Sequence, residues 1–239
     1  MFYSRIFSGG DMHIPDGFLN NNLAGGLLTG ALGMLGYCLN KILKTIPVTV
    51  GIIADNVSGA NIDSHSFGFS ENTSKYFQRL TLVALWVFAF QMFNIPVKSA
   101  TSAHLLGGVF AAILAGPFAG FIIMSFILII QSLFFSDGGV LALGANILNM
   151  AFIGSFLSYY VYKTFSNKSR YLGVFVACFF SVIAASLACL IELGLSGAIA
   201  FSTAFKNMMS LHFGVSCFET LITLALLKVF RSVNGESNE

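Results

Sequence analysis

Apolar runs about as long as a bilayer is thick recur along this chain and restrict it to a membrane fold. A transmembrane helix needs about 20 mostly apolar residues. Residues 118–135 contain no charged side chain, and residues 171–193 contain only Glu192. Hydrophobic residues make up 56% of the 239 residues and charged residues only 9%. This composition excludes an ordinary soluble domain and indicates a multi-pass membrane protein.

Seven apolar runs predict an all-α, polytopic bundle of about seven transmembrane helices. The runs are residues 23–39, 80–95, 104–115, 118–135, 144–162, 171–193 and 211–229. An odd number of spans places the two termini on opposite sides of the membrane. The bundle therefore has one terminus outside the cell and one inside.

The basic residues predict which terminus is inside, because cytoplasmic loops carry an excess of Lys and Arg. With the N-terminus outside and the C-terminus cytoplasmic, nine basic residues are cytoplasmic and two are external, leaving aside Arg5. The cytoplasmic set is Lys41, Lys44, Lys75, Arg79, Lys163, Lys168, Arg170, Lys228 and Arg231; the external set is Lys98 and Lys206. We expect this orientation in the cell (inner) membrane.

The polar segment Met12-His13-Ile14-Pro15-Asp16-Gly17, just before the first apolar run, has the chemistry of a metal chelate. If Met12 starts the chain, its α-amine, the backbone nitrogen of His13 and Nδ1 of His13 close two chelate rings around one ion. Three nitrogens in one plane suit Ni(II) or Cu(II), and Co(II) can be held similarly. Pro15 fixes a bend, and Asp16-Gly17 predicts a turn into the first helix.

A planar site needs a fourth donor, and His104 is the best candidate because it opens the third apolar run on the predicted outer face. We therefore assign Met12, His13 and His104 as metal ligands. Four further polar residues are candidates for contacts around these ligands: Gln91, Asn94, His212 and Glu219. The Glu219 carboxylate would orient a ligand imidazole or pair with a polar side chain of another helix.

The sequence predicts one transmembrane metal-binding domain over residues 12–230 and a polar tail over residues 231–239. Residues 45–79 are predicted to be an amphipathic or polar cytoplasmic segment, because residues 55–75 are rich in Ser, Asn and Gly. Residues 1–11 contain no signal-peptide apolar region. The codons for Gly9-Gly10-Asp11 can contain a ribosome-binding sequence at a normal distance from a start codon at Met12. We therefore expect residues 1–11 to be a misannotated or removed extension and the mature chain to begin at Met12.

Two other function classes stay open from the residues alone. A passive divalent-cation channel would need charged rings or filter carbonyls. An intramembrane metalloenzyme would need a general base beside the metal, and Glu219 has Val215 and Thr223 at i±4 instead of His. The chain has no P-loop and no HExxH, so we expect no enzyme activity and an ATP-hydrolysing partner for uphill import. Four cysteines without CxxC spacing are predicted to be buried apolar residues: Cys38, Cys178, Cys189 and Cys217.

Five motifs carry a resemblance to a known family: MHIPDGFL at 12–19, QMFNIPV at 91–97, TSAHLLGG at 101–108, DGGVLALGAN at 137–146 and ELGLSG at 192–197. Together they resemble the NikM/CbiM family, the substrate-binding components of energy-coupling-factor nickel and cobalt transporters. The resemblance implies seven transmembrane helices and an ion held by the Met12 amine, the His13 backbone and imidazole nitrogens, and His104.

The same resemblance implies the partners and the cargo. Ni(II) or Co(II) would be the transported substrate, without an organic cofactor, and would serve nickel enzymes or cobalamin biosynthesis. The partners would be a transmembrane coupling component, two cytoplasmic ATPases and often a small accessory membrane subunit, with no nucleic acid. Residues 1–11, which would block the amine, and the long polar stretch 55–75 depart from the family pattern.

Overall fold

The computed structural model describes residues 13–45, 71–92, 95–97, 101–103, 105–199 and 201–233. Met12, Asn94 and His104 lie outside these residues. The α-helices are α1 (Asn21–Thr45), α2 (Glu71–Gln91), α3 (Gly108–Ala115), α4 (Pro117–Ile130), α5 (Leu143–Asn146), α6 (Ser158–Ser166), α7 (Arg170–Leu195) and α8 (Phe201–Val233). Two π-helical stretches are η1 (Gln131–Phe135) and η2 (Ile147–Leu157). Strands β1 (Ile95–Val97) and β2 (Thr101–Ala103) form an antiparallel hairpin with Pro96 opposite Ser102.

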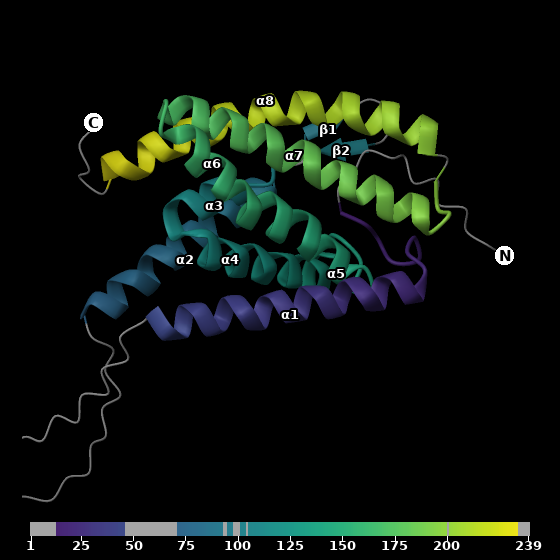
Figure 1. The fold of residues 1–239 in the computed structure, drawn as a ribbon, viewed down its shortest axis with the longest axis horizontal. Coiled ribbons are helices and arrows are strands. Elements are labelled where there is room, and N and C mark those ends of the chain that lie inside the picture. Colours follow the sequence, from purple (N-terminus) through teal and green to yellow (C-terminus); the bar gives the residue numbers. More distant parts are fainter. Residues whose placement is uncertain are drawn as a thin grey trace, which may run out of the picture.

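The helices join into rods that correspond to the predicted apolar runs (Figure 1). η1 continues α4, and α5, η2 and α6 follow one another as one rod. The all-α membrane fold is therefore confirmed. Among the residues that the structure describes, four rods are long and apolar enough to cross a membrane, judged by length and composition: Asn21–Thr45, Pro117–Phe135, Arg170–Leu195 and Ala204–Phe230. The rod of α5, η2 and α6 carries the buried Asn146 and Asn149, which lower its mean hydropathy.

Two helices differ in length from the predicted apolar runs. Helix α2 begins at Glu71 and not at residue 80, so the end of the predicted polar segment 45–79 is helical. The third run, predicted as a span over residues 104–115, contains an α3 of only 8 residues. A helix of that length is about 12 Å long and by itself is shorter than a hydrocarbon core of about 30 Å. Gly108 to Ala112 of α3 are buried, so α3 lies inside the bundle.

Local sequence explains how several of these elements start. The side chain of Asn20 accepts a hydrogen bond from the Leu23 N–H at 2.8 Å and so caps α1. Gly116 has φ +85° between α3 and α4, and Pro117 takes the first position of α4, where its missing N–H costs nothing. These residues let α3 and α4 lie against each other across one tight connection.

The core fills the space between α1 on one side and α7 with α8 on the other (Figure 1). Its largest buried side chains include Phe110 of α3, Phe121 of α4 and Met150 of η2. Cys38, Cys178 and Cys189 are buried as predicted, whereas Cys217 is exposed on α8, which corrects that part of the prediction.

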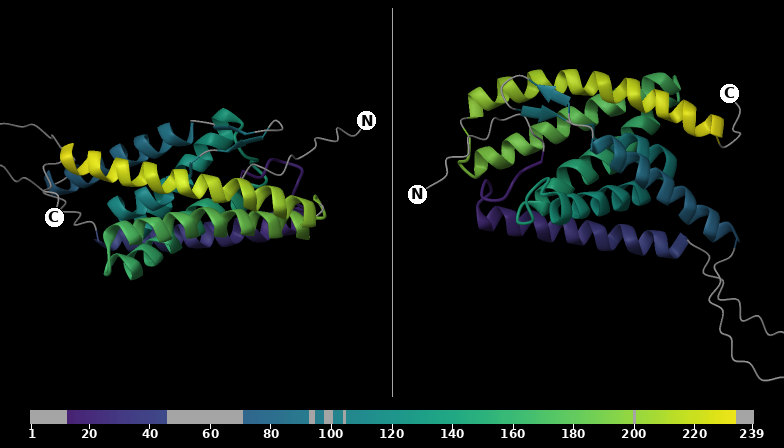
Figure 2. Two further views of the ribbon diagram at one scale, coloured as in Figure 1. Left: turned by 90° about the horizontal axis from the view of Figure 1, so that it is seen from above. Right: turned by 180° about the vertical axis from the view of Figure 1, so that it is seen from behind.

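The bundle has two chemically different ends, which Figure 2 shows from two further directions. At one end α1 finishes, α2 begins, α6 meets α7, and α8 finishes. These positions carry the predicted cytoplasmic basic residues, and Arg79 of α2 lies 6.0 Å from the ring of Phe230 in α8. The start of α1 and the start of α8, with Lys206, lie at the opposite end. We call the first the basic end. We call the second, which residues 13–20 cross before α1 begins, the strap end.

Candidate metal centre

Residues 13–20, called the strap here, cross the strap end of the bundle before α1 begins (Figure 1). Its central contact is with Asn146, which binds both backbone groups of Ile14. The Ile14 N–H donates to Asn146 Oδ1 at 2.9 Å, and Asn146 Nδ2 donates to the Ile14 carbonyl at 3.1 Å. The Gly139 N–H donates to the same carbonyl at 2.9 Å. Ile14 is 0% exposed, so this pairing fixes the strap in a water-free position.

The strap also depends on two glycines of the loop between η1 and α5. Asp16 Oδ1 accepts a hydrogen bond from the Leu141 N–H at 2.7 Å. A Cβ on Gly139 would overlap the Asp16 backbone and carboxylate, and a Cβ on Gly138, at φ +83°, would lie 2.9 Å from Asn146 Nδ2. Only glycine permits this close approach. The predicted Asp16-Gly17 turn is present, with Gly17 at φ +88°.

His13 is the one assigned metal ligand among the described residues, and it is 4% exposed. Its Nδ1 lies 2.9 Å from Asp137 Oδ1. The predicted chelate uses this same nitrogen, so an ion bound there would replace the contact with Asp137. The carboxylate would then stand beside a divalent cation and favour its charge.

A second non-helical stretch, residues 105–107, leads from β2 into α3; we call it the entry segment. Leu105 is 4% exposed and Leu106 is 0% exposed. Both oxygens of Glu219 accept backbone hydrogen bonds from it, from Leu106 N at 2.9 Å and from Gly107 N at 2.7 Å. The expectation that Glu219 orients an imidazole or pairs with a polar side chain is therefore replaced by a carboxylate bound to backbone.

Gln91 binds the entry segment from the other side. Its Nε2 donates to the Leu106 carbonyl at 2.6 Å, and its Oε1 accepts from Gln131 Nε2 at 2.9 Å. Gln91 and Glu219 thus bind the same short stretch of backbone. Sequence analysis missed Gln131, although a single Gln inside the apolar run 118–135 is the kind of residue that signals a buried polar contact.

His212 and the remaining buried carboxylate make local contacts. His212 Nδ1 lies 2.8 Å from the Met208 carbonyl of its own helix. Asn149 Nδ2 donates to Glu192 Oε2 at 2.7 Å. Both interactions satisfy polar groups within the bundle, which favours a structural role for His212.

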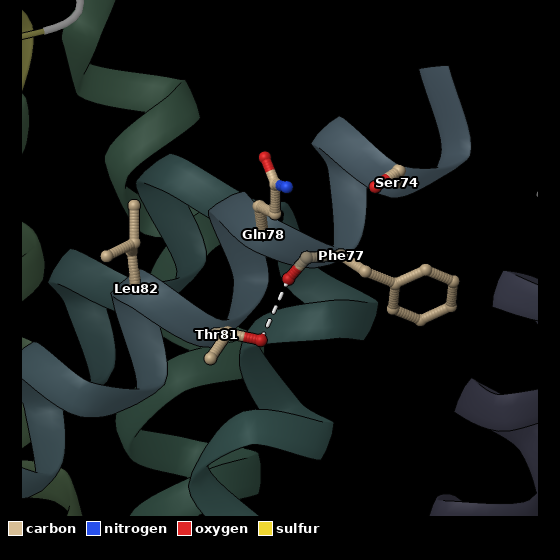
Figure 3. A pocket seen from close by; sticks show the side chains of 5 residues that line it. All are labelled: Ser74, Phe77, Gln78, Thr81 and Leu82. Carbon is tan, nitrogen blue, oxygen red and sulfur yellow. Dashed lines mark hydrogen bonds between the residues drawn. The ribbon is translucent and has the colours of Figure 1, made fainter. Parts of the chain in front are cut away.

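A hollow beside α2 is lined by Ser74, Phe77, Gln78, Thr81 and Leu82 (Figure 3). Thr81 Oγ1 donates to the Phe77 carbonyl at 3.0 Å within the helix. The lining offers no His, Cys, Asp or Glu, so it lacks the ligands of a transition-metal site. Across the part of the chain that the structure describes, no three such side chains form a metal-binding group.

Two solved structures share this architecture. The crystal structure of a transition metal transporter aligns with a TM-score of 0.74 and 28% identity over 95% of each chain. That of a truncated transition metal transporter aligns with a TM-score of 0.72 and 28% identity over 94% of this chain and 100% of that one. The fold and the buried strap thus define a multi-pass helical membrane protein of the transition-metal transporter class.

The family model for the "cobalt uptake substrate-specific transmembrane region", CbiM, matches residues 13–237. The chain belongs to this family and is a transport component of the CbiM/NikM type, which confirms the resemblance seen in the motifs.

Curated relatives agree with this membership. A putative fused nickel transport protein NikMN of Archaeoglobus fulgidus is 35% identical over 80% of this chain and 55% of its own. A putative metal transport protein of Haloquadratum walsbyi is 32% identical over 89% of this chain and 86% of its own. A probable fused nickel transport protein LarMN of Lactiplantibacillus plantarum is 32% identical over 81% of this chain. The chain spans about half the length of the fused relatives, 55% and 52%.

Proposed function

We propose that this protein is the substrate-specific membrane subunit of an ATP-driven energy-coupling-factor importer for Ni(II) or Co(II). It captures the ion outside the cell in a planar nitrogen site made by the Met12 amine, His13 and His104. The observation that carries the proposal is the pair of hydrogen bonds between the Asn146 side chain and the backbone of Ile14, directly after His13. This pairing supports the proposal because it holds the segment that carries His13 in a buried position.

The strap contacts support a chelate that forms without large rearrangement. Asn146 fixes the peptide that follows His13, so the His13 ring and backbone nitrogen are held on one short, immobile stretch. Fixing ligands in advance removes the entropy cost of ordering them when the ion arrives. The backbone nitrogen must lose its proton to bind, so capture should fail in acid.

The ion and the partners follow from the family. Relatives named for nickel and for cobalt transport match this chain, and a planar set of nitrogens suits these ions. Import against a gradient would require the coupling component and two ATPases, with or without an accessory membrane subunit, because this chain carries no P-loop. Residues 1–11 would be absent from the functional chain.

Calorimetric titration tests the amine ligand. Protein that starts at Met12 should bind Ni(II) tightly, whereas the same chain with an acetylated Met12 amine should lose most of its affinity. His13→Ala should abolish retention of the ion. Equal affinity in the free and acetylated forms would overturn the amine clamp, and so would intact-mass data showing residues 1–11 on protein that carries nickel or cobalt.

The orientation is proposed from the basic end and has its own test. In a Cys217→Ser background, Lys41→Cys at the basic end should react with a membrane-impermeant maleimide only from the cytoplasmic side. Lys206→Cys at the strap end should react only from outside. The opposite labelling pattern in whole cells and inverted vesicles would reverse the proposed topology.

A further inference from the structure

The peptide groups of the entry segment need hydrogen-bond partners from elsewhere in the bundle. Leu105 and Leu106 are buried and lie outside any helix, so a helix does not satisfy their peptide groups. An unsatisfied peptide group in hydrocarbon costs several kcal/mol, and such backbone is tolerated only where protein satisfies it. Gly107 adds a further constraint, since it has φ +68° and a Cβ there would lie 3.0 Å from Val87 Cγ1.

Three side chains from three different rods provide these hydrogen bonds or orient the groups that make them. Glu219 of α8 accepts from two consecutive N–H groups, and Gln91 of α2 donates to the carbonyl between them. Gln131 of η1 orients Gln91 by donating to its Oε1. We call Gln91, Gln131 and Glu219 the polar cluster. Their exposed fractions are 1%, 0% and 1%, so water does not compete for these bonds.

The cluster lies deep in the bundle. Glu219 stands near the middle of the apolar stretch Ala204–Phe230, well away from both of its ends. A carboxylate at such a position is costly unless its hydrogen bonds are made, and residues of this kind usually have a function.

Two further details indicate that the cluster does more than satisfy the backbone groups of the entry segment. Gln131 Oε1 is buried and has no hydrogen-bond partner in the structure, which leaves one open acceptor in the cluster. Gln131 also begins the π-helical stretch η1, and π-helical turns occur frequently at functional sites.

We propose that Gln91, Gln131 and Glu219 are positioning residues for ion capture: they fix the backbone of residues 105–107, which directly follow His104 in the sequence. This inference rests on the proposed function, in which His104 is the fourth ligand. The polar cluster acts on the backbone next to that ligand and never touches the ion. Asn146 does the same for His13, so each half of the site has its own backbone clamp.

Glu219→Gln is the sharpest test because it keeps the size of the side chain. One of its two acceptors becomes an NH2 group that faces a backbone N–H. Loss of a partner that orients a ligand typically weakens metal binding about 10- to 100-fold. We expect that loss for Ni(II), together with a change in the visible absorption of bound Ni(II) and faster hydrogen exchange at Leu106 and Gly107.

Glu192→Gln is the matched control, since it changes another buried carboxylate whose bond goes to the Asn149 side chain. It should leave Ni(II) affinity, the absorption spectrum and the exchange of residues 106 and 107 unchanged. Gln91→Met supplies a second variant if Glu219→Gln does not fold, and it should shift the same three measurements in the same direction.

The possible outcomes distinguish a failure of the positioning role from a failure of the proposed ion-capture function. Wild-type protein that binds no Ni(II) would overturn the proposed function. Wild-type protein that binds Ni(II) while folded Glu219→Gln or Gln91→Met keeps the affinity and spectrum would overturn the positioning role alone. Equal losses in Glu219→Gln and Glu192→Gln would also overturn it, because the effect would then belong to buried polar groups in general.

Discussion

Asn146→Ala should release the strap by an amount that the structure allows us to estimate. The substitution removes two buried hydrogen bonds to Ile14, at 2.9 and 3.1 Å. The Ile14 carbonyl keeps the Gly139 N–H, but the Ile14 N–H loses its bond to Asn146. One net hydrogen bond contributes about 1 kcal/mol, and a buried donor left unpaired costs about 1–3 kcal/mol. The free energy of opening the strap should therefore fall by about 2–4 kcal/mol.

Native-state hydrogen exchange measures this change directly. A loss of about 2–4 kcal/mol corresponds to roughly 30- to 1,000-fold faster exchange of the Ile14 amide, since about 1.4 kcal/mol is a factor of ten. Ni(II) affinity should fall about tenfold or more for protein starting at Met12, because His13 is no longer held. Both measurements can be made on protein in detergent, provided that the helical content of the variant is unchanged.

Asn149→Ala is the control for this prediction. Asn149 follows Asn146 by one helical turn and is equally buried, yet its amide donates to Glu192 and not to the strap. Its removal should leave the exchange of Ile14 unchanged. The reasoning fails if Ile14 exchanges at the wild-type rate in Asn146→Ala, or if both variants accelerate it equally.

Two further substitutions test the same geometry. Gly139→Ala should lower both Tm and Ni(II) affinity, because its Cβ would overlap Asp16. Gly36→Ala, with open space around its Cβ position, is the control. A Gly139→Ala protein with unchanged thermal unfolding and unchanged Ni(II) titration would contradict the strap packing. His212→Ala should cost more than about 1 kcal/mol of stability, because it removes the bond to the Met208 carbonyl and leaves a cavity where a side chain was 1% exposed. Ni(II) affinity should stay within about threefold, less than 1 kcal/mol. A drop of tenfold or more in that titration would instead place His212 in the ion site.

The membrane bundle and its family could be predicted from sequence because both depend on local patterns. Apolar runs long enough to cross a bilayer have one stable solution, a helix that satisfies its own backbone. The concentration of basic residues at one end of the bundle also follows from their positions between the apolar runs of the sequence. His13 could be proposed as a ligand from sequence because His next to a possible chain start is a chelating pattern, whatever the fold around it.

The partners of the polar residues were decided by tertiary structure. Asn146 and Ile14 are 132 positions apart, and Glu219 and Leu106 are 113 apart, so no local pattern could show that they meet. The same is true of α3: residues 104–115 are apolar enough for a helix, but the carboxylate and amide of distant helices stabilise residues 105–107 as non-helical backbone. Composition determined that this protein lies in a membrane, whereas long-range packing determined which backbone groups its buried Asn, Gln and Glu residues hold in place.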